Sequence, residues 1–203
     1  MTNKPIGSAI RTFSGVLFDF AHPELSPISL VDIAHSLSLL CRFAGHTKKF
    51  YSVAEHAVRV SYACEPELAM WGLHHDDSEC YCVDIPRPLK HLEGMENYRE
   101  HERKVQKAII AELNSILRMH DLAETEPTEV KWADMRLLVT EQRDLLHNSH
   151  PDFKSVPPLK NEIKPWSSRK ANYIYQIRHA ELSGWKLTWY DKVILWHLKC
   201  TLI

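Results

Sequence analysis

Histidine and aspartate side chains occur within three apolar stripes that recur at helical spacing, and this pattern constrains the fold more than any other feature. The first stripe surrounds His56, the second leads to His75 and Asp76, and the third surrounds Asp134. Helices that each carry one apolar face bury those faces against one another. Side chains on the buried faces of such helices can converge inside a bundle. We therefore expect an all-α helical bundle in which these four side chains meet.

The four residues are the types that bind a divalent transition metal. Imidazole and carboxylate groups together suit zinc, cobalt, manganese or iron, and two carboxylates offset the charge of a dication. A water molecule on such an ion becomes a usable nucleophile near neutral pH. A single inward histidine is usually a hydrogen-bonded core residue, and a single inward aspartate is usually half of an ion pair. The conjunction of all four residues favours a site for one metal ion.

A neighbouring pair, His74 and Asp77, competes for the middle of this set, because it offers the same chemistry. The position of Glu79 favours His75 and Asp76. Asp76 and Glu79 are three residues apart, so on a helix they share neighbouring surface. The cysteines at positions 80 and 82 follow directly, and we interpret them as packing residues.

Helical spacing also predicts the surrounding elements. Residues 30–41 form an expected helix that delivers Arg42 and Phe43 at its end, and Ser52 to Glu55 have the form of a capping box that begins the helix of His56. Further helices are expected over residues 98–117 and 167–182, the last ending before Gly184.

Two segments do not follow the helical pattern. Alternating apolar residues near Thr12 to Phe20 predict a short hairpin that covers the bundle. Two prolines interrupt the segment from Asp84 to Lys90, which is therefore expected to be a shaped loop. A proline-containing connector is expected over residues 150–166.

Composition limits the class of protein. With 203 residues, 44% of them hydrophobic, the chain suits one domain with a substantial core. Its net charge of −1 gives no broad basic field for a nucleic acid polymer or a membrane surface. The first residues lack the apolar core of a signal peptide, and five cysteines form no disulfide framework. These features predict a cytoplasmic protein.

Five segments in order carry a resemblance to a known superfamily: residues 41–47, 51–56, 75–79, 84–90 and 131–134. Together they resemble the HD-domain phosphohydrolases over about residues 10–184. Within that superfamily the chain is most similar to phage HD-domain dNTP (dATP) triphosphohydrolases and to bacterial HD-domain 5'-deoxynucleotidases. The resemblance implies an HD-domain helical bundle with one metal ion held by His56, His75, Asp76 and Asp134.

The resemblance also implies catalytic and substrate-binding residues. Glu79 and Asp84 are expected beside the ion, where a carboxylate can orient water or move a proton. Three cations are expected to hold phosphate, and Phe43, where related nucleotidases often have tryptophan, is expected to contact the base or deoxyribose. The three cations are Arg42, Lys90 and Lys131.

These residues predict hydrolysis of deoxynucleotide 5'-phosphates, with dATP favoured as the substrate and with deoxyadenosine and triphosphate as products. Additional magnesium would then accompany the substrate phosphates. The alternatives are a 5'-deoxynucleotidase that releases orthophosphate from monophosphates and an inactive nucleotide-binding module. Residues 185–203 form a C-terminal extension with three tryptophans, which favours a contact with a second copy in a homo-oligomer.

Overall fold

The structure is a computed structural model that describes residues 7–117, 122–148 and 155–202. The described chain is mostly helical and has one two-stranded antiparallel hairpin near its start, as expected. Residues 1–6, which belong to the segment without the apolar core of a signal peptide, lie outside the described ranges. Residues 150–154 of the expected connector lie outside them as well. The elements in chain order are β1 (Ala9–Arg11), β2 (Leu17–Asp19), η1 (Pro23–Leu25), α1 (Leu30–Leu39), η2 (Arg42–Gly45), α2 (Val53–Ala63), η3 (Pro66–Leu68), α3 (Ala69–His74), α4 (Glu79–Cys82), α5 (Arg87–Lys90), α6 (Glu96–Leu117), α7 (Thr128–Leu145), α8 (Ser168–Leu182) and α9 (Trp189–Leu202).

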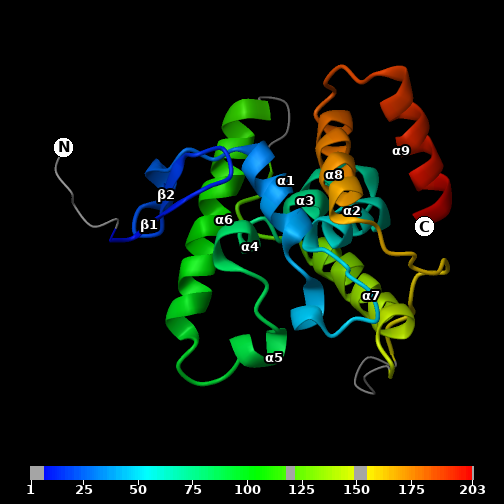
Figure 1. Cartoon of the computed structure of the whole chain (residues 1–203), viewed down its shortest axis with the longest axis horizontal. Helices are drawn as coiled ribbons and strands as arrows, with labels where there is room; N and C mark the ends of the chain where they lie inside the picture. Colours follow the sequence, from blue (N-terminus) through cyan, green and yellow to red (C-terminus); the bar gives the residue numbers. More distant parts are fainter. Residues whose placement is uncertain (1–6, 118–121, 149–154, 203) are drawn as a thin grey trace.

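Helix α2 forms the centre of the bundle and packs against α1, α3, α7 and α8. Ten consecutive residues of α2, from Val53 to Tyr62, are buried, so the helix is enclosed on all sides. Figure 1 shows α6 and the hairpin on one side of this central group and α9 on the other. The hydroxyl of Ser52 accepts the N–H of Glu55 at 3.1 Å, as expected for the start of α2. The Glu55 carboxylate turns away and binds Arg59 instead.

The hairpin is present as expected, and β1 pairs with β2 in register from Ala9 opposite Asp19 to Arg11 opposite Leu17. Its buried residue Phe18 stacks on Tyr81 with ring centroids 3.6 Å apart. At the hairpin turn, Ser14 donates two hydrogen bonds of 2.7 Å to the Asp32 carboxylate on α1. The hairpin therefore packs on the α1 and α4 side of the bundle.

The expected helix over residues 30–41 ends earlier, at Leu39. Leu40 is extended, and Cys41 forms an isolated β-bridge with Ser52. Arg42 and Phe43 consequently lie on the separate turn η2 and not at the end of α1. The reason is that the backbone of this segment bonds to the residues just before α2, with Arg42 donating its N–H to the carbonyl of Tyr51 at 3.0 Å.

The expectation of a purely irregular segment from Asp84 to Lys90 is also wrong, because its last four residues form the single helical turn α5. Its prolines do not break this turn. Pro86 precedes the helix and Pro88 lies in its first turn, where the backbone N–H has no helical partner in any case.

Helix α8 begins at the Ser167 cap and ends before Gly184, which has a φ of +68°, as expected for a helix-ending glycine. The extension then forms α9, whose inner residues Leu195, Leu198 and Leu202 are buried. Cys80 and Cys82 pack against the core, as expected. None of the helices in the described part of the chain has the length and apolar character that crossing a membrane requires.

Candidate metal centre

Four side chains from three parts of the bundle meet beside α2. The Nε2 atom of His56 lies 3.2 Å from Nε2 of His75, 3.1 Å from Oδ1 of Asp134 and 3.6 Å from Oδ2 of Asp76. The same Asp76 oxygen lies 3.2 Å from Nε2 of His75. His56, His75 and Asp134 form a group that could hold a metal ion, and the carboxylate of Asp76, the fourth expected ligand, lies beside this group.

The spacing of these donor atoms fits a bound divalent ion. Ligand atoms at about 2.0–2.2 Å from a zinc-like ion are separated from one another by about 3.0–3.5 Å. Among His56, His75 and Asp134, two separations are 3.1 and 3.2 Å and the widest is 4.0 Å, between His75 and Asp134. The donor chemistry fits as well, because two imidazoles and two carboxylates suit borderline divalent metals.

Both imidazoles are oriented through their second nitrogen. His75 Nδ1 lies 2.9 Å from the carbonyl of Gly72 and donates to it, which leaves Nε2 with a free lone pair. His56 Nδ1 lies 2.6 Å from Oε1 of Glu141. Hydrogen bonds of this kind fix the tautomer that a metal ligand needs.

The pair that competes with His75 and Asp76 points elsewhere. His74 Nδ1 lies 2.5 Å from Asp77, and His74 Nε2 lies 2.9 Å from Nδ1 of His179 on α8. The hydroxyl of Tyr175 donates to the second oxygen of Asp77. This second cluster is buried and satisfied by internal hydrogen bonds, so the geometry favours His75 and Asp76 as the metal-site pair.

His75 and Asp76 do not lie within a helix, contrary to expectation. Helix α3 ends at His74, and His75 and Asp76 occupy the turn before α4. Gln106 on α6 holds this turn at both ends: it donates to the carbonyl of His74 at 2.7 Å and accepts the N–H of Ser78 at 2.9 Å. A side chain thus supplies hydrogen bonds that a continuous helix would have made.

Carboxylates dominate the electrostatics of the four donors. Burial lowers the pKa of the His75 imidazole, but Asp76 and then Asp134 more than offset it, and the pKa rises to about 10. Burial raises the pKa of Asp76, yet His75 outweighs it and the pKa falls below its ordinary value. The site therefore favours a positive charge among its donors, whether a proton or a metal cation.

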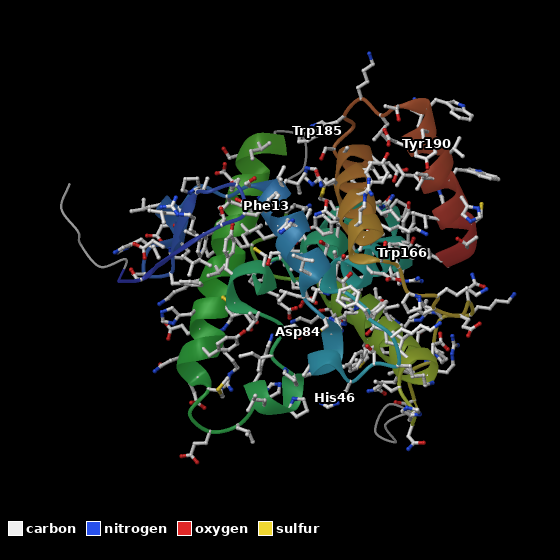
Figure 2. The ribbon with its side chains drawn as sticks, in the orientation of Figure 1. Phe13, His46, Asp84, Trp166, Trp185 and Tyr190 are labelled. Carbon is white, nitrogen blue, oxygen red and sulfur yellow. The ribbon has the colours of Figure 1, made fainter. Side chains whose placement is uncertain are left out.

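Glu79 lies next to the donors and is buried. Its Oε1 is 3.4 Å from the ammonium of Lys90, and its Oε2 has no hydrogen-bond partner within the described part of the chain. Burial, with the charges of Asp76 and Asp84, raises the pKa of Glu79 well above its ordinary value. Asp84 lies on the segment that joins α4 and α5 (Figure 2). The two expected catalytic carboxylates therefore interact electrostatically.

Of the three expected phosphate-binding cations, Arg42 lies closest to the donors. Its Nη1 is 3.4 Å from Oδ2 of Asp76, and its guanidinium lies 5.7 Å from the Phe43 ring centroid. Phe43 and Ala44 have φ values of +54° and +49°. Residues other than glycine are strained in this left-handed region, and here two such residues follow one another. Backbone strain of this kind clusters at functional sites.

The other two cations are paired with acids outside the four donors, whereas Arg42 contacts one of the donors. The ammonium of Lys90 lies 2.6 Å from Glu102. The side chain of Lys131 is 63% exposed and lies 3.7 Å from Glu126, so helical spacing to Asp134 did not bring it over the donors. Lys131 stands at the edge of the site, next to a glutamate that helps to raise the pKa of His75.

Glu141 is the site residue that the sequence interpretation missed. It is fully buried on α7 and lies 2.6 Å from His56 and 3.3 Å from Nε of Arg42. Burial raises its pKa, but Arg42 and His56 outweigh burial and lower it. A signal was present, because Glu141 follows Asp134 by seven residues, or two helical turns, and so shares its helix face.

No known family model matches the chain. The chain is 22% identical over 153 residues to the 5'-deoxynucleotidase PM0747 of Pasteurella multocida (strain Pm70), which covers 62% of this chain and 78% of that protein. This distant similarity supports the HD type of phosphohydrolase, although neither relative found shows the expected similarity to phage enzymes. The chain is also 45% identical over 138 residues to the uncharacterized protein YfdR of Escherichia coli (strain K12), which covers 68% of this chain and 72% of YfdR. The chain therefore belongs to the same family as YfdR.

Proposed function

We propose that this protein is a metal-dependent phosphohydrolase of deoxynucleotides, with His56, His75, Asp76 and Asp134 as the metal ligands. The observation that carries the proposal is the convergence of His56, His75 and Asp134, whose donor atoms lie 3.1–4.0 Å from one another, with Oδ2 of Asp76 3.2 Å from His75 and 3.6 Å from His56. The similarity to a 5'-deoxynucleotidase adds independent support.

The donor set accepts zinc, cobalt, manganese or iron. A bound divalent ion would lower the pKa of a water molecule toward neutrality and polarise the phosphoryl group. The residues of the chain supply the remainder of the chemistry. The two imidazoles keep their Nε2 lone pairs directed at the ion position through Gly72 and Glu141.

Glu79 is proposed as the group that moves a proton during attack on phosphorus. Its Oε2, which has no hydrogen-bond partner among the described residues, can accept a proton from the attacking water or donate one to the departing 5'-oxygen. Lys90 holds the other oxygen of Glu79 in place. Asp84 is proposed to position the water or a sugar hydroxyl, because its charge acts on both Glu79 and Arg42.

Phosphate binding is proposed to rest on Arg42. Its guanidinium, held near Asp76, is positioned to direct its remaining N–H donors at a phosphate on the metal, and a planar guanidinium suits that role. Phe43 is proposed to contact the base or the deoxyribose, since its ring lies beside Arg42.

The number of available cations favours a 5'-deoxynucleoside monophosphate as the substrate. Lys90 is paired with Glu102 and Lys131 with Glu126, outside the four donors. Arg42 is also paired, with Asp76 and Glu141, but it is the one of the three that contacts a proposed metal ligand. A triphosphate chain carries more charge and calls for more cations. Cleavage of dATP to deoxyadenosine and triphosphate is therefore the second candidate, and it gains support if substrate binding releases Lys90 and Lys131 from their acids.

Product analysis separates the two candidates. The full chain, loaded with manganese or cobalt, is incubated with dAMP and with dATP, and the products are resolved by anion-exchange chromatography. Orthophosphate from dAMP, abolished by a chelator, is the expected result. Inorganic triphosphate from dATP with dAMP untouched would establish the second candidate. An absence of any nucleotide turnover would favour a nucleotide-binding module.

We also propose that the outer face of α9 contacts a second copy of the chain. Trp189, Tyr190 and Trp196 are 78%, 62% and 68% exposed, although the opposite face of α9 is buried. Tyr190 lies at the edge of the molecule (Figure 2). At roughly 150–250 Å² for each aromatic side chain, the three expose about 300–500 Å², comparable to the largest apolar patch of a typical monomer.

Light scattering with size-exclusion chromatography tests this contact. The wild-type chain is expected to elute as a dimer and Trp196→Glu as a folded monomer. Lys104→Glu, a charge change on the exposed face of α6, on the other side of the molecule from α9, serves as the control and should remain dimeric. A wild-type chain that is monomeric at all concentrations would contradict the proposal.

A further inference from the structure

We propose that Glu141 is a positioning residue that joins metal binding to phosphate binding. One carboxylate contacts both a proposed metal ligand and the proposed phosphate-binding cation. Its Oε1 lies 2.6 Å from His56 Nδ1, and its Oε2 lies 3.3 Å from Arg42 Nε. The inference rests on the proposed function for the roles of His56 and Arg42.

The contact with His56 determines which imidazole nitrogen faces the metal position. Glu141 accepts the proton on Nδ1, so Nε2 is left as the lone-pair donor that faces His75 and Asp134. Carboxylates that bind the far nitrogen of a ligating histidine fix its ring and raise its basicity. Because His56 is fully buried, water cannot take over this role.

The contact with Arg42 fixes the start of the turn η2, whose backbone is strained. Arg42 begins η2, in which Phe43 and Ala44 adopt left-handed conformations. Neither Arg42 Nε nor Glu141 Oε2 makes a hydrogen bond within the described residues, so their ion pair is the contact that compensates both buried atoms. Removing either partner leaves an uncompensated buried charge.

The two contacts use different oxygen atoms, and this distinguishes the possible substitutions. Glutamine offers one acceptor oxygen and one donor nitrogen, so Glu141→Gln can serve either His56 or Arg42 but not both. Aspartate keeps both acceptors but is shorter by one methylene. Glu141→Asp therefore retains the charge and loses the reach.

The test measures binding of Mn²⁺ and of inorganic phosphate to the metal-depleted full chain by isothermal titration calorimetry. We expect Glu141→Gln to weaken Mn²⁺ binding by about 10–100-fold, the usual scale for losing the partner of a metal-bound histidine. Phosphate binding to the Mn²⁺-loaded protein should weaken as well. Arg42→Ala should weaken phosphate binding, and because Arg42 also contacts Asp76 and Glu141, its effect on Mn²⁺ affinity should be smaller than that of Glu141→Gln. Glu129→Gln, an exposed residue of the same helix, is the matched control and should change neither.

The inference is overturned if Glu141→Gln, folded by circular dichroism, binds both Mn²⁺ and phosphate within twofold of the wild type, because one amide cannot serve both His56 and Arg42. If that variant does not fold, Glu141→Asp gives the same test, and unchanged affinities for both ligands would again overturn the inference. Mn²⁺ binding does not depend on turnover. A wild-type chain that binds Mn²⁺ but hydrolyses no deoxynucleotide would therefore refute the proposed function and leave the Glu141 measurement interpretable.

Discussion

Two histidine–aspartate pairs lie next to each other in the sequence but occupy opposite environments. His75 and Asp76 face His56 and Asp134, and the carboxylates of this group are about one quarter exposed. His74 and Asp77 face His179 and Tyr175 and are fully buried. The residue types are the same, so composition alone does not make the metal site.

The difference lies in how the donor atoms of each group are arranged. In the His75 group the Nε2 atoms and carboxylate oxygens converge on one another, and the carboxylates raise the pKa of His75 to about 10, so the metal-free group binds a proton where a cation could bind. In the His74 group each polar atom has a hydrogen-bond partner, and burial together with His74 lowers the pKa of His179 to about 3. Two imidazoles that converge on part-exposed carboxylates identify a candidate metal centre, whereas a fully buried network in which each polar atom has its own partner identifies a structural support.

The largest expected effect is loss of the metal from the His75 group. His75→Ala or Asp134→Ala should abolish both metal binding and turnover, because each removes one of four donors. Metal content by mass spectrometry and nucleotide hydrolysis are the measurements. His74→Gln is the matched control: it should lower stability but retain one metal per chain. If His74→Gln lost the metal while His75→Ala and Asp134→Ala retained it, the metal site would have to be assigned to the second cluster.

The next effect concerns chemistry at the same centre. Glu79→Gln should retain the metal yet reduce kcat by roughly 10²-fold, the usual scale for losing a general acid or base. Glu102→Gln also removes a partner of Lys90 and serves as the control, with a much smaller expected change. An unchanged kcat in Glu79→Gln would assign the proton-transfer role to Asp84 instead.

The two clusters also predict opposite pH dependences for the metal-free protein. The pKa of His75 is raised from 6.5 to about 10, so its contribution to stability is complete below pH 6.5 and is lost as the pH rises toward 10. The pKa of His179 is lowered to about 3, so its contribution is present above pH 6.5 and is lost as the pH falls toward 3.

Urea unfolding between pH 7 and 9 measures the first of these contributions. The free energy of unfolding should fall by up to about 1.4 kcal/mol per pH unit through His75. Saturating Mn²⁺ should reduce this slope, because the ion replaces the proton. An equally steep slope in His75→Gln would assign it to other groups.

The smallest effect is expected in the second cluster. Tyr175→Phe removes the hydroxyl that donates to Asp77 and should cost about 1–3 kcal/mol of stability. Metal affinity should change little, because Gln106 still holds the turn that carries His75. A large loss of metal affinity in Tyr175→Phe would show that the two clusters are not independent.

Sequence patterns predicted the parts of the site that lie on long helices. His56 and Asp134 could be predicted from the sequence because the apolar residues around each of them recur at a helical period over several turns. Arg42 and Phe43 were misplaced on a helix, because the bridge between Cys41 and Ser52 is a tertiary contact that no local pattern records.

The choice between His74 and His75 shows the same limit. Both stand at the end of one helix, and their directions depend on the hydrogen bonds that Gln106 and Asp77 supply. The two-turn spacing to Asp134 could have predicted Glu141 as a site residue. Several acids share that helix, however, and burial is what distinguishes Glu141 from the exposed Glu129.

The most direct test of the metal centre is anomalous diffraction from a crystal of the chain grown with Mn²⁺. The expected result is one anomalous peak within about 2.0–2.3 Å of His56 Nε2, His75 Nε2, Asp76 and Asp134. A peak between His74 and His179, or no peak at the four donors at saturating Mn²⁺, would contradict the account.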